Sequence, residues 1–267
     1  MQLSSTHTAL RVDRFSGSDL SPQRSQLSVK LADTRALVEA AQRLRYRVFV
    51  DELGASIDRH DGRDVDQFDA LCDHLVVIDE QRDKVVGTYR ILPPWGARKL
   101  GQRYCETEFR IDALRPLLND LFEAGRACIH PAYRSGQHGA VLSHLWSGLG
   151  RYASQNNVKY LGGCASVPLD AGTSDLSALR AELMTRHLAP IEYRIEPIRG
   201  IPDLVSPDGG KPSMPALLRA YLRMGAWVCG EPAWDTQFDV ADFFVLLPVQ
   251  RMAPRYAKHF LGGATTL

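Results

Sequence analysis

The sequence predicts a mixed-sheet α/β domain, and three features of the 267-residue chain predict it. Segments with strand-like and helix-like patterns alternate along the chain. Pairs of strand-like segments stand near both ends. A strand–helix–strand unit occupies the middle, over residues 123–168. Together these features predict one domain over residues 27–267, preceded by a flexible arm.

The arm covers residues 1–26, which are rich in Ser, Thr, Gln and Arg and show no clear period. Residues 27–34 (LSVKLADT) predict a strand that ends at a helix cap, Asp33 or Thr34. Residues 35–53 predict a helix because apolar side chains recur at helical spacing, at Leu37, Leu44, Val48 and Phe49. An Asp-rich loop follows.

Residues 74–80 and 84–92 are apolar segments around a short polar turn, which predicts an antiparallel hairpin ending at Pro93. A loop and a short helix near residues 111–120 come next. Residues 123–130 then predict a strand, and residues 140–155 a helix. The apolar face of that helix carries Val141, Leu145, Trp146, Leu149 and Tyr152.

The remaining pattern predicts a strand over 159–168 and a helix over 175–188. A Pro- and Gly-rich insert occupies about residues 189–214. A helix over 215–225 and two closing strands, 226–232 and 241–249, complete the domain.

Composition restricts the class of function. The formal net charge is +1, so no global field favours nucleic acid as a partner. The five cysteines are scattered and show no metal-type spacing, which favours a reduced, cytoplasmic compartment and predicts no metal site. No apolar run approaches the roughly 18 residues that would suggest a membrane span.

The order of elements resembles the Gcn5-related N-acyltransferase (GNAT) fold. The resemblance implies a mixed, mostly antiparallel sheet flanked by helices, in which strands 123–130 and 159–166 splay apart. The pantetheine arm of an acyl thioester would enter the gap and meet the strand backbone near Cys128 and Ile129. A backbone N–H near Ile129 is the expected donor to the oxyanion of the transition state.

The turn RSGQHGA, residues 134–140, is where that fold binds phosphate. Arg134 supplies charge, Gly136 and Gly139 allow close backbone approach, and a helix N-terminus favours an anion. Gln137 stands where the superfamily signature has its middle glycine. A carrier protein presents a single phosphate on its pantetheine arm, so this turn favours acyl carrier protein over coenzyme A as the donor.

Charged residues follow a spaced pattern that resembles the acyl-homoserine lactone synthases, which belong to the same superfamily. The pattern is Arg-x-x-x-Phe, Asp-x-x-Asp, Gly-x-x-Arg and Glu-x-x-Arg. Its charged and aromatic members are Arg45, Phe49, Asp66, Asp69, Arg90, Glu123 and Arg126. Ala55 stands where those synthases carry a Trp.

A longer resemblance, over about residues 27–261, is to the ornithine-acyl carrier protein N-acyltransferases, often labelled hemolysin-like. It is carried by RYRVFVDELGA, DQFDALCDHLVV, GRACIHPAYR, RYAKHFL and the block from Leu218 to Pro248. The resemblance implies transfer of a 3-hydroxyacyl chain from acyl carrier protein to the α-amine of ornithine. The product is lyso-ornithine lipid, and no cofactor is needed beyond the acyl-phosphopantetheine of the donor.

The residues themselves leave alternatives open. Glu123 is either the base that deprotonates the amine or a structural partner of Arg126 or Arg90. Asp66 and Asp69 either hold an ammonium group or order their loop, and a charge network with Arg45, Arg90 and Arg126 is the favoured interpretation. Cys128 is expected to be a buried thiol.

Two other functions stay open: an acyl-homoserine lactone synthase, and an N-acyltransferase for glycine, lysine or glutamine. A membrane-lytic protein is disfavoured, because no long amphipathic helix is visible. Since the expected product is a lipid, peripheral contact with the inner membrane is also expected, through the insert or residues 255–261.

Overall fold

The computed structural model describes residues 26–57, 61–134, 138–169, 173–202 and 214–252. The arm expected over residues 1–26 lies outside the described residues except for its last residue. Gly136, part of the insert and the segment 255–261 lie outside them as well.

One central sheet of eight strands organises the chain, with the order β1-β2-β3-β5-β6-β10-β8 and β9 paired to β10. Its strands are β1 (Leu27–Leu31), β2 (Asp73–Asp79), β3 (Lys84–Leu92), β5 (Leu121–Ile129), β6 (Tyr160–Pro168), β8 (Trp227–Val228), β9 (Ala233–Asp235) and β10 (Val240–Pro248). A small ribbon pairs β4 (Phe109–Arg110) with β7 (Glu196–Pro197). Among the described strands, β5 and β6 pair in parallel and the other pairings are antiparallel, which confirms the predicted mixed sheet.

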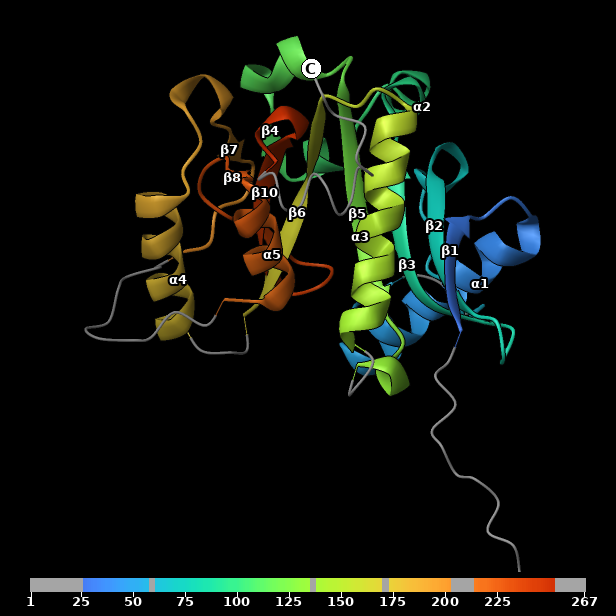
Figure 1. Ribbon diagram of the computed structural model, residues 1–267. Coiled ribbons are helices and arrows are strands. Elements are labelled where there is room, and N and C mark those ends of the chain that lie inside the picture. Colours follow the sequence, from blue (N-terminus) through green and yellow to red (C-terminus); the bar gives the residue numbers. More distant parts are fainter. Residues whose placement is uncertain (1–25, 58–60, 135–137, 170–172, 203–213, 253–267) are drawn as a thin grey trace, which may run out of the picture.

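Helices cover both faces of the sheet (Figure 1). They are α1 (Arg35–Tyr46), α2 (Pro94–Leu100), α3 (His138–Gln155), α4 (Thr173–Arg186) and α5 (Ala216–Met224). Between them lie a π-helical turn, Arg47–Glu52, and 3₁₀ turns at Asp69–Leu71, Tyr104–Thr107, Asp112–Leu117, Pro131–Tyr133, Ile191–Tyr193 and Val249–Arg251.

The apolar run of β2 is explained by burial on both sides of the sheet. Leu75 and Val77 belong to the core beneath α3, whereas Val76 and Ile78 pack against α1. Because neighbouring residues of a strand point to opposite faces, a strand covered on both sides has to be apolar throughout.

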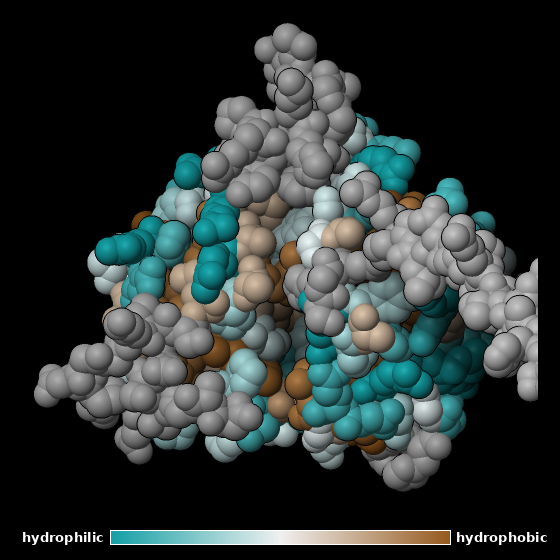
Figure 2. Space-filling view, turned by 60° about the horizontal axis from the view of Figure 1, so that its bottom comes forward, coloured by the Kyte–Doolittle hydropathy of each residue, from teal (hydrophilic) through white to brown (hydrophobic). Residues whose placement is uncertain are grey.

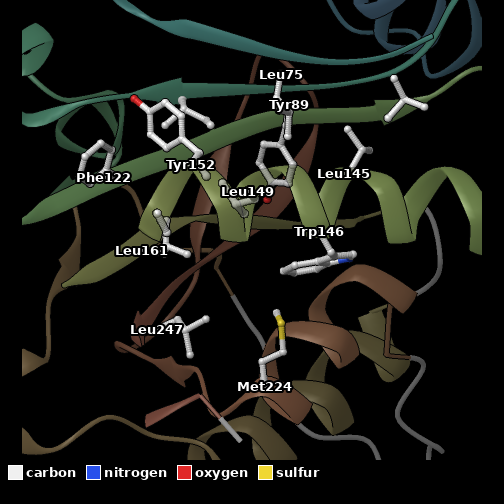
Figure 3. Packing of buried hydrophobic residues seen from close by; sticks show 14 of the residues in the cluster. Leu75, Tyr89, Phe122, Leu145, Trp146, Leu149, Tyr152, Leu161, Met224 and Leu247 are labelled. Carbon is white, nitrogen blue, oxygen red and sulfur yellow. The ribbon is translucent and has the colours of Figure 1, made fainter. Parts of the chain in front are cut away.

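The core beneath α3 is the largest, and Figure 3 shows how α3 closes it. Trp146 of α3 faces Met224 of α5 and Leu247 of β10, so the helix joins the two halves of the sheet. The predicted apolar face of this helix is confirmed, because its five residues are all buried: Val141, Leu145, Trp146, Leu149 and Tyr152.

Most of the predicted elements are confirmed. Thr34, the second of the two candidate caps, accepts a hydrogen bond from the N–H of Leu37 and starts α1. The predicted helix 35–53 is α-helical only to Tyr46 and then widens into the π-helical turn. The segment after Pro93, expected to be a loop, contains α2, which has proline at its first position.

The insert after residue 189 is ordered in its first part. The 3₁₀ turn at Ile191–Tyr193 leads into β7, which pairs with β4. The insert therefore adds to the packing around residues 104–118 instead of leaving the domain.

The parallel strands β5 and β6 separate after a short contact, as the GNAT resemblance implies. They pair only at Leu121–Tyr160, Phe122–Leu161 and Glu123–Gly162, although each strand continues for six more residues. At the vertex of this wedge the backbones are very close, since a Cβ on Gly163 would lie 2.1 Å from the carbonyl oxygen of Ala124. Glycine is required there for close approach.

Candidate active site

The wedge between β5 and β6 opens into a cavity of about 220 Å³. Its walls include Tyr89 of β3, Gly125 of β5, Cys164 of β6, Tyr221 of α5 and Asp242 of β10. Figure 2 shows the end of the molecule at which the strands diverge, where apolar residues lie in a central hollow between hydrophilic flanks. A second hollow adjoins the cavity, and Phe68, Tyr104, Arg126 and Asp235 line both.

A β-bulge places Arg126 in the cavity wall. Arg126 and Ala127 together stand opposite Tyr89, and Arg126 adopts a left-handed φ of 52°. Its guanidinium carbon lies 5.0 Å from the ring centre of Tyr104 and 4.6 Å from that of Phe238. One Nη donates to the Tyr104 hydroxyl over 3.3 Å. The guanidinium is thus held between two rings with donors to spare.

Arg126 belongs to a network of ion pairs. Its members are Arg45, Asp64, Asp66, Asp69, Arg90 and Arg126. Asp69 is its centre: it accepts from Arg45 over 2.6 Å and from Arg90 over 2.8 Å. Burial alone would raise the pKa of Asp69, but the two guanidinium groups hold it below its ordinary value.

The members of the network differ in their access to the cavity. Arg45 is fully buried and is bonded to Asp64, Asp69 and His74. Arg90 and Arg126 line the cavity, and Asp66 lines the second hollow. The predicted network is therefore present, and Asp64 joins it as a member that the sequence pattern had not indicated.

Glu123 lies at the vertex of the wedge and lines the cavity. Its two carboxylate oxygens accept backbone N–H groups of Cys105 (2.6 Å) and Tyr104 (3.0 Å). Burial raises the pKa of Glu123 despite these hydrogen bonds and the nearby Arg103. Glu123 therefore anchors the 3₁₀ turn that carries Tyr104, and no ion pair joins it to Arg126 or Arg90 in the described part of the chain.

The opposite side of the site is an acidic wall, defined here as Glu108, Asp235 and Asp242. All three are at least nine-tenths buried. Burial and the Asp242 and Asp235 carboxylates raise the pKa of Glu108, and burial and Asp235 raise the pKa of Asp242. Tyr104 donates its hydroxyl to Asp235 over 3.3 Å, so this one hydroxyl lies between Arg126 and the acidic wall.

The turn expected to bind phosphate is described only in part. Arg134 donates to the Ile129 carbonyl over 3.0 Å and pairs with Glu52. Gly139 is exposed in the first turn of α3, and Gly136 lies outside the described residues. Ile129 pairs with Gly87 of β3 and is buried.

Phe49 and Cys128 both belong to the cluster that packs around α1, but of the two only Phe49 lines the cavity. Phe49 lines the cavity and makes an edge contact with Phe238, with ring centres 5.7 Å apart. Cys128 packs against α1 with Leu44 and Val76, and burial raises the pKa of its thiol to about 12. Its side chain is a core group, as the sequence favoured.

One group of side chains has the spacing of a metal site. Ligand atoms of Glu108, Cys164 and Asp242 lie within 4.8 Å of one another. The Cys164 thiol donates to Glu108 over 3.3 Å, and burial raises the pKa of this thiol well above its ordinary value. A protonated thiol is a poor ligand, so the group in this state is better suited to binding protons or organic cations.

The acidic wall, Tyr104 and Phe238 were missed by sequence reasoning. They come from three separate segments whose proximity depends on the order of strands, which no local pattern reveals. Asp242 gave one usable signal, because a carboxylate within the apolar strand ADFFVLLP has to be buried or functional.

Comparisons with known proteins agree with the fold. Residues 44–147 match the acetyltransferase (GNAT) domain family. The AHL synthase LasI has a similar structure, with a TM-score of 0.51 and 14% identity, covering 91% of this chain and 99% of that chain. The chain therefore has the GNAT fold.

Two relatives in sequence are informative. The L-ornithine N(alpha)-acyltransferase of Rhodobacter capsulatus is 36% identical over 251 residues, which covers 87% of this chain and 93% of the relative. The acyl-homoserine-lactone synthase of Rhizobium etli is 32% identical over 144 residues, covering 52% of this chain and 65% of that protein.

In the described part of the chain no helix has the length and apolar character needed to cross a membrane.

Proposed function

Because the chain belongs to the family of L-ornithine N(alpha)-acyltransferases, we propose that it joins a 3-hydroxyacyl chain to the α-amine of ornithine and so forms lyso-ornithine lipid. The chain is an acyltransferase. The observation that carries the choice of substrates is the wedge between β5 and β6, which opens into a cavity with Arg126 on one side and carboxylates on the other.

The donor is proposed to lie along the diverging strands. Beyond Glu123 and Gly162 the facing edges of β5 and β6 no longer pair with each other, so a pantetheine arm with two amides finds backbone partners there. The carbonyl of the thioester would then stand beside Gly125 and Arg126. The expected oxyanion donor near Ile129 lies three residues beyond Arg126 along β5, about 10 Å away, and Ile129 pairs with Gly87 of β3. A backbone N–H of β5 beside Arg126 is therefore the proposed donor to the oxyanion.

The reaction is the aminolysis of a thioester. The amine nitrogen bonds to the carbonyl carbon, the C–S bond breaks, and the amine proton passes to a base and finally to the leaving thiol. Glu123 is the proposed base, because burial raises its pKa toward that of an amine and its oxygens keep lone pairs beyond those used by Tyr104 and Cys105.

Arg90 and Arg126 are proposed to face the carboxylate of the amino acid, with Phe49 closing the apolar side of the cavity. Asp66 and Asp69 then act by fixing these two cations, together with Arg45 behind them. Because Arg45 is fully buried, its proposed role in substrate binding is indirect.

Acyl carrier protein is the proposed donor. Arg134 is only partly buried and sits with Gly139 at the β5–α3 connection, so it is accessible to an acidic partner. Arg134→Glu is expected to raise the KM for the acyl carrier protein without raising the KM for ornithine. Equal KM values for the carrier in both proteins would rule out docking at Arg134.

The test of function uses the purified full chain. Incubation with 3-hydroxyacyl carrier protein or the matching coenzyme A thioester, and with ornithine, lysine, glutamine or glycine, is followed by mass spectrometry of the products. We expect N-acylornithine, formed faster from the carrier protein. No N-acyl amino acid under any condition would refute the proposed function.

A signal synthase is the second candidate, favoured by the partial match to the Rhizobium etli protein. Supplying S-adenosylmethionine as the acceptor distinguishes the two, since a lactone synthase releases methylthioadenosine. We expect no methylthioadenosine.

Peripheral contact with the inner membrane is also proposed, because the product is a lipid. Recovery of all the protein in the supernatant of lysed cells would contradict it.

A further inference from the structure

The acidic wall brings three buried carboxyl groups close together. Within the part of the chain that the structure describes, Glu108, Asp235 and Asp242 form no salt bridge, although all three are buried. The carboxylates of the ion network, by contrast, each face a guanidinium group. Buried carboxylates without a counter-ion are destabilising, so the wall needs a further explanation.

The hydrogen bonds made by the wall leave one oxygen without a partner. Asp235 accepts the Tyr104 hydroxyl and the N–H groups of Gln237 (2.8 Å) and Phe238 (3.2 Å). Glu108 accepts the Cys164 thiol. Oδ1 of Asp242 has no hydrogen-bond partner among the described residues and is shielded from solvent, and Asp242 is one of the residues that line the cavity.

The wall is also reachable from both sides of the site. Asp242 and Asp235 line the cavity in the wedge, whereas Glu108 and Asp235 line the adjoining hollow. Across the Tyr104 hydroxyl stands the guanidinium group of Arg126. The site therefore has a cationic end and an anionic end, one hydroxyl apart. A ligand with a carboxylate at one end and an ammonium group at the other matches it.

We infer that the acidic wall binds the side-chain ammonium of a diamino acid acceptor and selects such acceptors over amino acids that lack a second cation. Arg126 holds the α-carboxylate, Asp242 and Glu108 receive the side-chain ammonium, and the α-amine is left free between them to meet the thioester. This inference rests on the proposed function, since it assumes that the acceptor is an amino acid.

Binding of the ammonium is coupled to loss of a proton. In the empty site the raised pKa values of Glu108 and Asp242 favour a proton shared between them, and an incoming cation favours the ionised pair. The charged and titratable groups around the pair are Asp235 of β9, Tyr104 of the 3₁₀ turn, Cys164 of β6 and Arg126 of β5. Selectivity for a diamino acid is therefore expected to rise with pH.

The test compares ornithine with norvaline, which has the same three-carbon side chain without the ammonium group. Asp242→Asn and Glu108→Gln keep the size of the side chain and remove the charge. For each variant we expect the ratio of kcat/KM for ornithine to kcat/KM for norvaline to fall at least ~10-fold, the effect of one lost charge-assisted contact. Glu192→Gln, at an exposed carboxylate on the insert, serves as the matched control and should keep the wild-type ratio.

Several outcomes would overturn the inference. One is an equal loss for both acceptors, which would mean that the carboxylates support the fold only. Another is loss of activity on chelation with EDTA, which would assign Glu108, Cys164 and Asp242 to a metal ion. A third is a selectivity ratio that stays flat from about pH 6 to about pH 8, where the α-amines of both acceptors titrate alike.

Calorimetric titration separates this inference from the proposed function. If the wild-type protein acylates no amino acid, the proposed function fails, but ornithine and norvaline can still be compared as ligands. Tighter binding of ornithine that is lost in Asp242→Asn supports the acidic wall as an ammonium site. Equal affinities for the two amino acids refute it whatever the catalytic result.

Discussion

At the scale of single residues, Arg126 combines a strained backbone with a functional position. Its left-handed φ costs an L-amino acid about 1 kcal/mol or more. The bulge that imposes this conformation also turns the guanidinium group toward Tyr104 and Phe238. The backbone conformation of Arg126 therefore lowers the stability of the fold and at the same time positions its guanidinium group in the site.

Substitutions of Arg126 should separate its effect on stability from its effect on substrate binding. We expect Arg126→Gly to lower the free energy of unfolding by less than the about 3–5 kcal/mol of a broken buried pair, because relief of strain offsets part of the lost ion contacts and Asp64 and Asp66 keep Arg45 and Arg90. The same variant should lose more than ~10²-fold in kcat/KM for the amino acid. Urea denaturation and steady-state kinetics measure the two quantities. Arg126→Lys keeps the charge and the strained φ, so a Lys variant that is less stable than the Gly variant would contradict this account.

Glu108 offers a second residue-scale test, through the pH dependence of stability. Its pKa in the folded protein lies above the ordinary 4.5, so above pH 4.5 the unfolded chain binds fewer protons than the folded chain. This group therefore makes the protein less stable as pH rises. Glu108→Gln removes the effect and keeps a hydrogen-bond donor beside Asp242.

We expect Glu108→Gln to be more stable than the wild type by about 1 kcal/mol at neutral pH, with a smaller difference near pH 4.5. Thermal unfolding at both pH values measures it, with Glu192→Gln as the control. A variant less stable than the wild type at neutral pH would show that the Glu108 carboxylate is satisfied in the folded protein.

At the scale of elements, the wedge depends on one close approach. A Cβ at Gly163 would collide with the carbonyl of Ala124, whereas a Cβ at Gly125, on the facing strand, would meet no atom within 4 Å. Both glycines stand where β5 and β6 part, but they contact different things: Gly163 meets the other strand, and Gly125 lines the cavity.

The two glycines form a matched pair for mutation. Gly163→Ala should reduce the free energy of unfolding by about 1–3 kcal/mol, the usual cost of overpacking. Gly125→Ala should leave the unfolding midpoint nearly unchanged and lower kcat/KM for the acyl donor, since its methyl group occupies the proposed donor path. Equal destabilisation by both changes would mean that the strands can separate freely.

Some elements of the fold could be predicted from the sequence and others could not. The β2–β3 hairpin, α3 and the cap of α1 were predicted because their signals lie within a few residues of one another. The widening of the helix after Tyr46 and the helix after Pro93 were not, since both depend on packing against distant segments. The ion network was predicted because the spacing of its charged residues resembles the pattern of the acyl-homoserine lactone synthases. The acidic wall was not, because β9, β10 and residue 108 meet only through the order of the sheet.

At the scale of the whole molecule, the ion network ties four parts of the chain together: α1, the loop before β2, β3 and β5. Arg45 reaches Asp64 and Asp69 from α1 and is completely buried. Removal of one partner from a buried set of charges is far more destabilising than loss of a surface pair. The network should therefore determine acid stability as well as the position of Arg126.

Replacing Arg45 tests this role. Arg45→Met is expected to lower the free energy of unfolding by about 3–5 kcal/mol, because two carboxylates lose their buried counter-ion. The control is Arg63→Met, which removes partly exposed pairs with Asp61 and Glu39 and should change stability by less than ~1 kcal/mol.

The effect of Arg45 should also depend on pH in a defined direction. The depressed pKa of Asp69 contributes stability above its ordinary value of 3.8, and this contribution is lost as pH falls below it. The difference between wild type and Arg45→Met, followed by chemical denaturation from neutral pH downward, should therefore shrink in acid. A constant difference would exclude Asp69 as the source.

The brief contact between β5 and β6 has a mechanical consequence. Three residue pairs join one half of the sheet to the other, so the sheet offers least resistance to bending along that seam. A thioester arm lying in the gap would bridge the halves as an additional strand does, and would stiffen the hinge that it occupies. Amide hydrogens on the facing edges of both strands should then exchange more slowly when the donor is bound, which makes the loaded enzyme a more rigid body than the empty one.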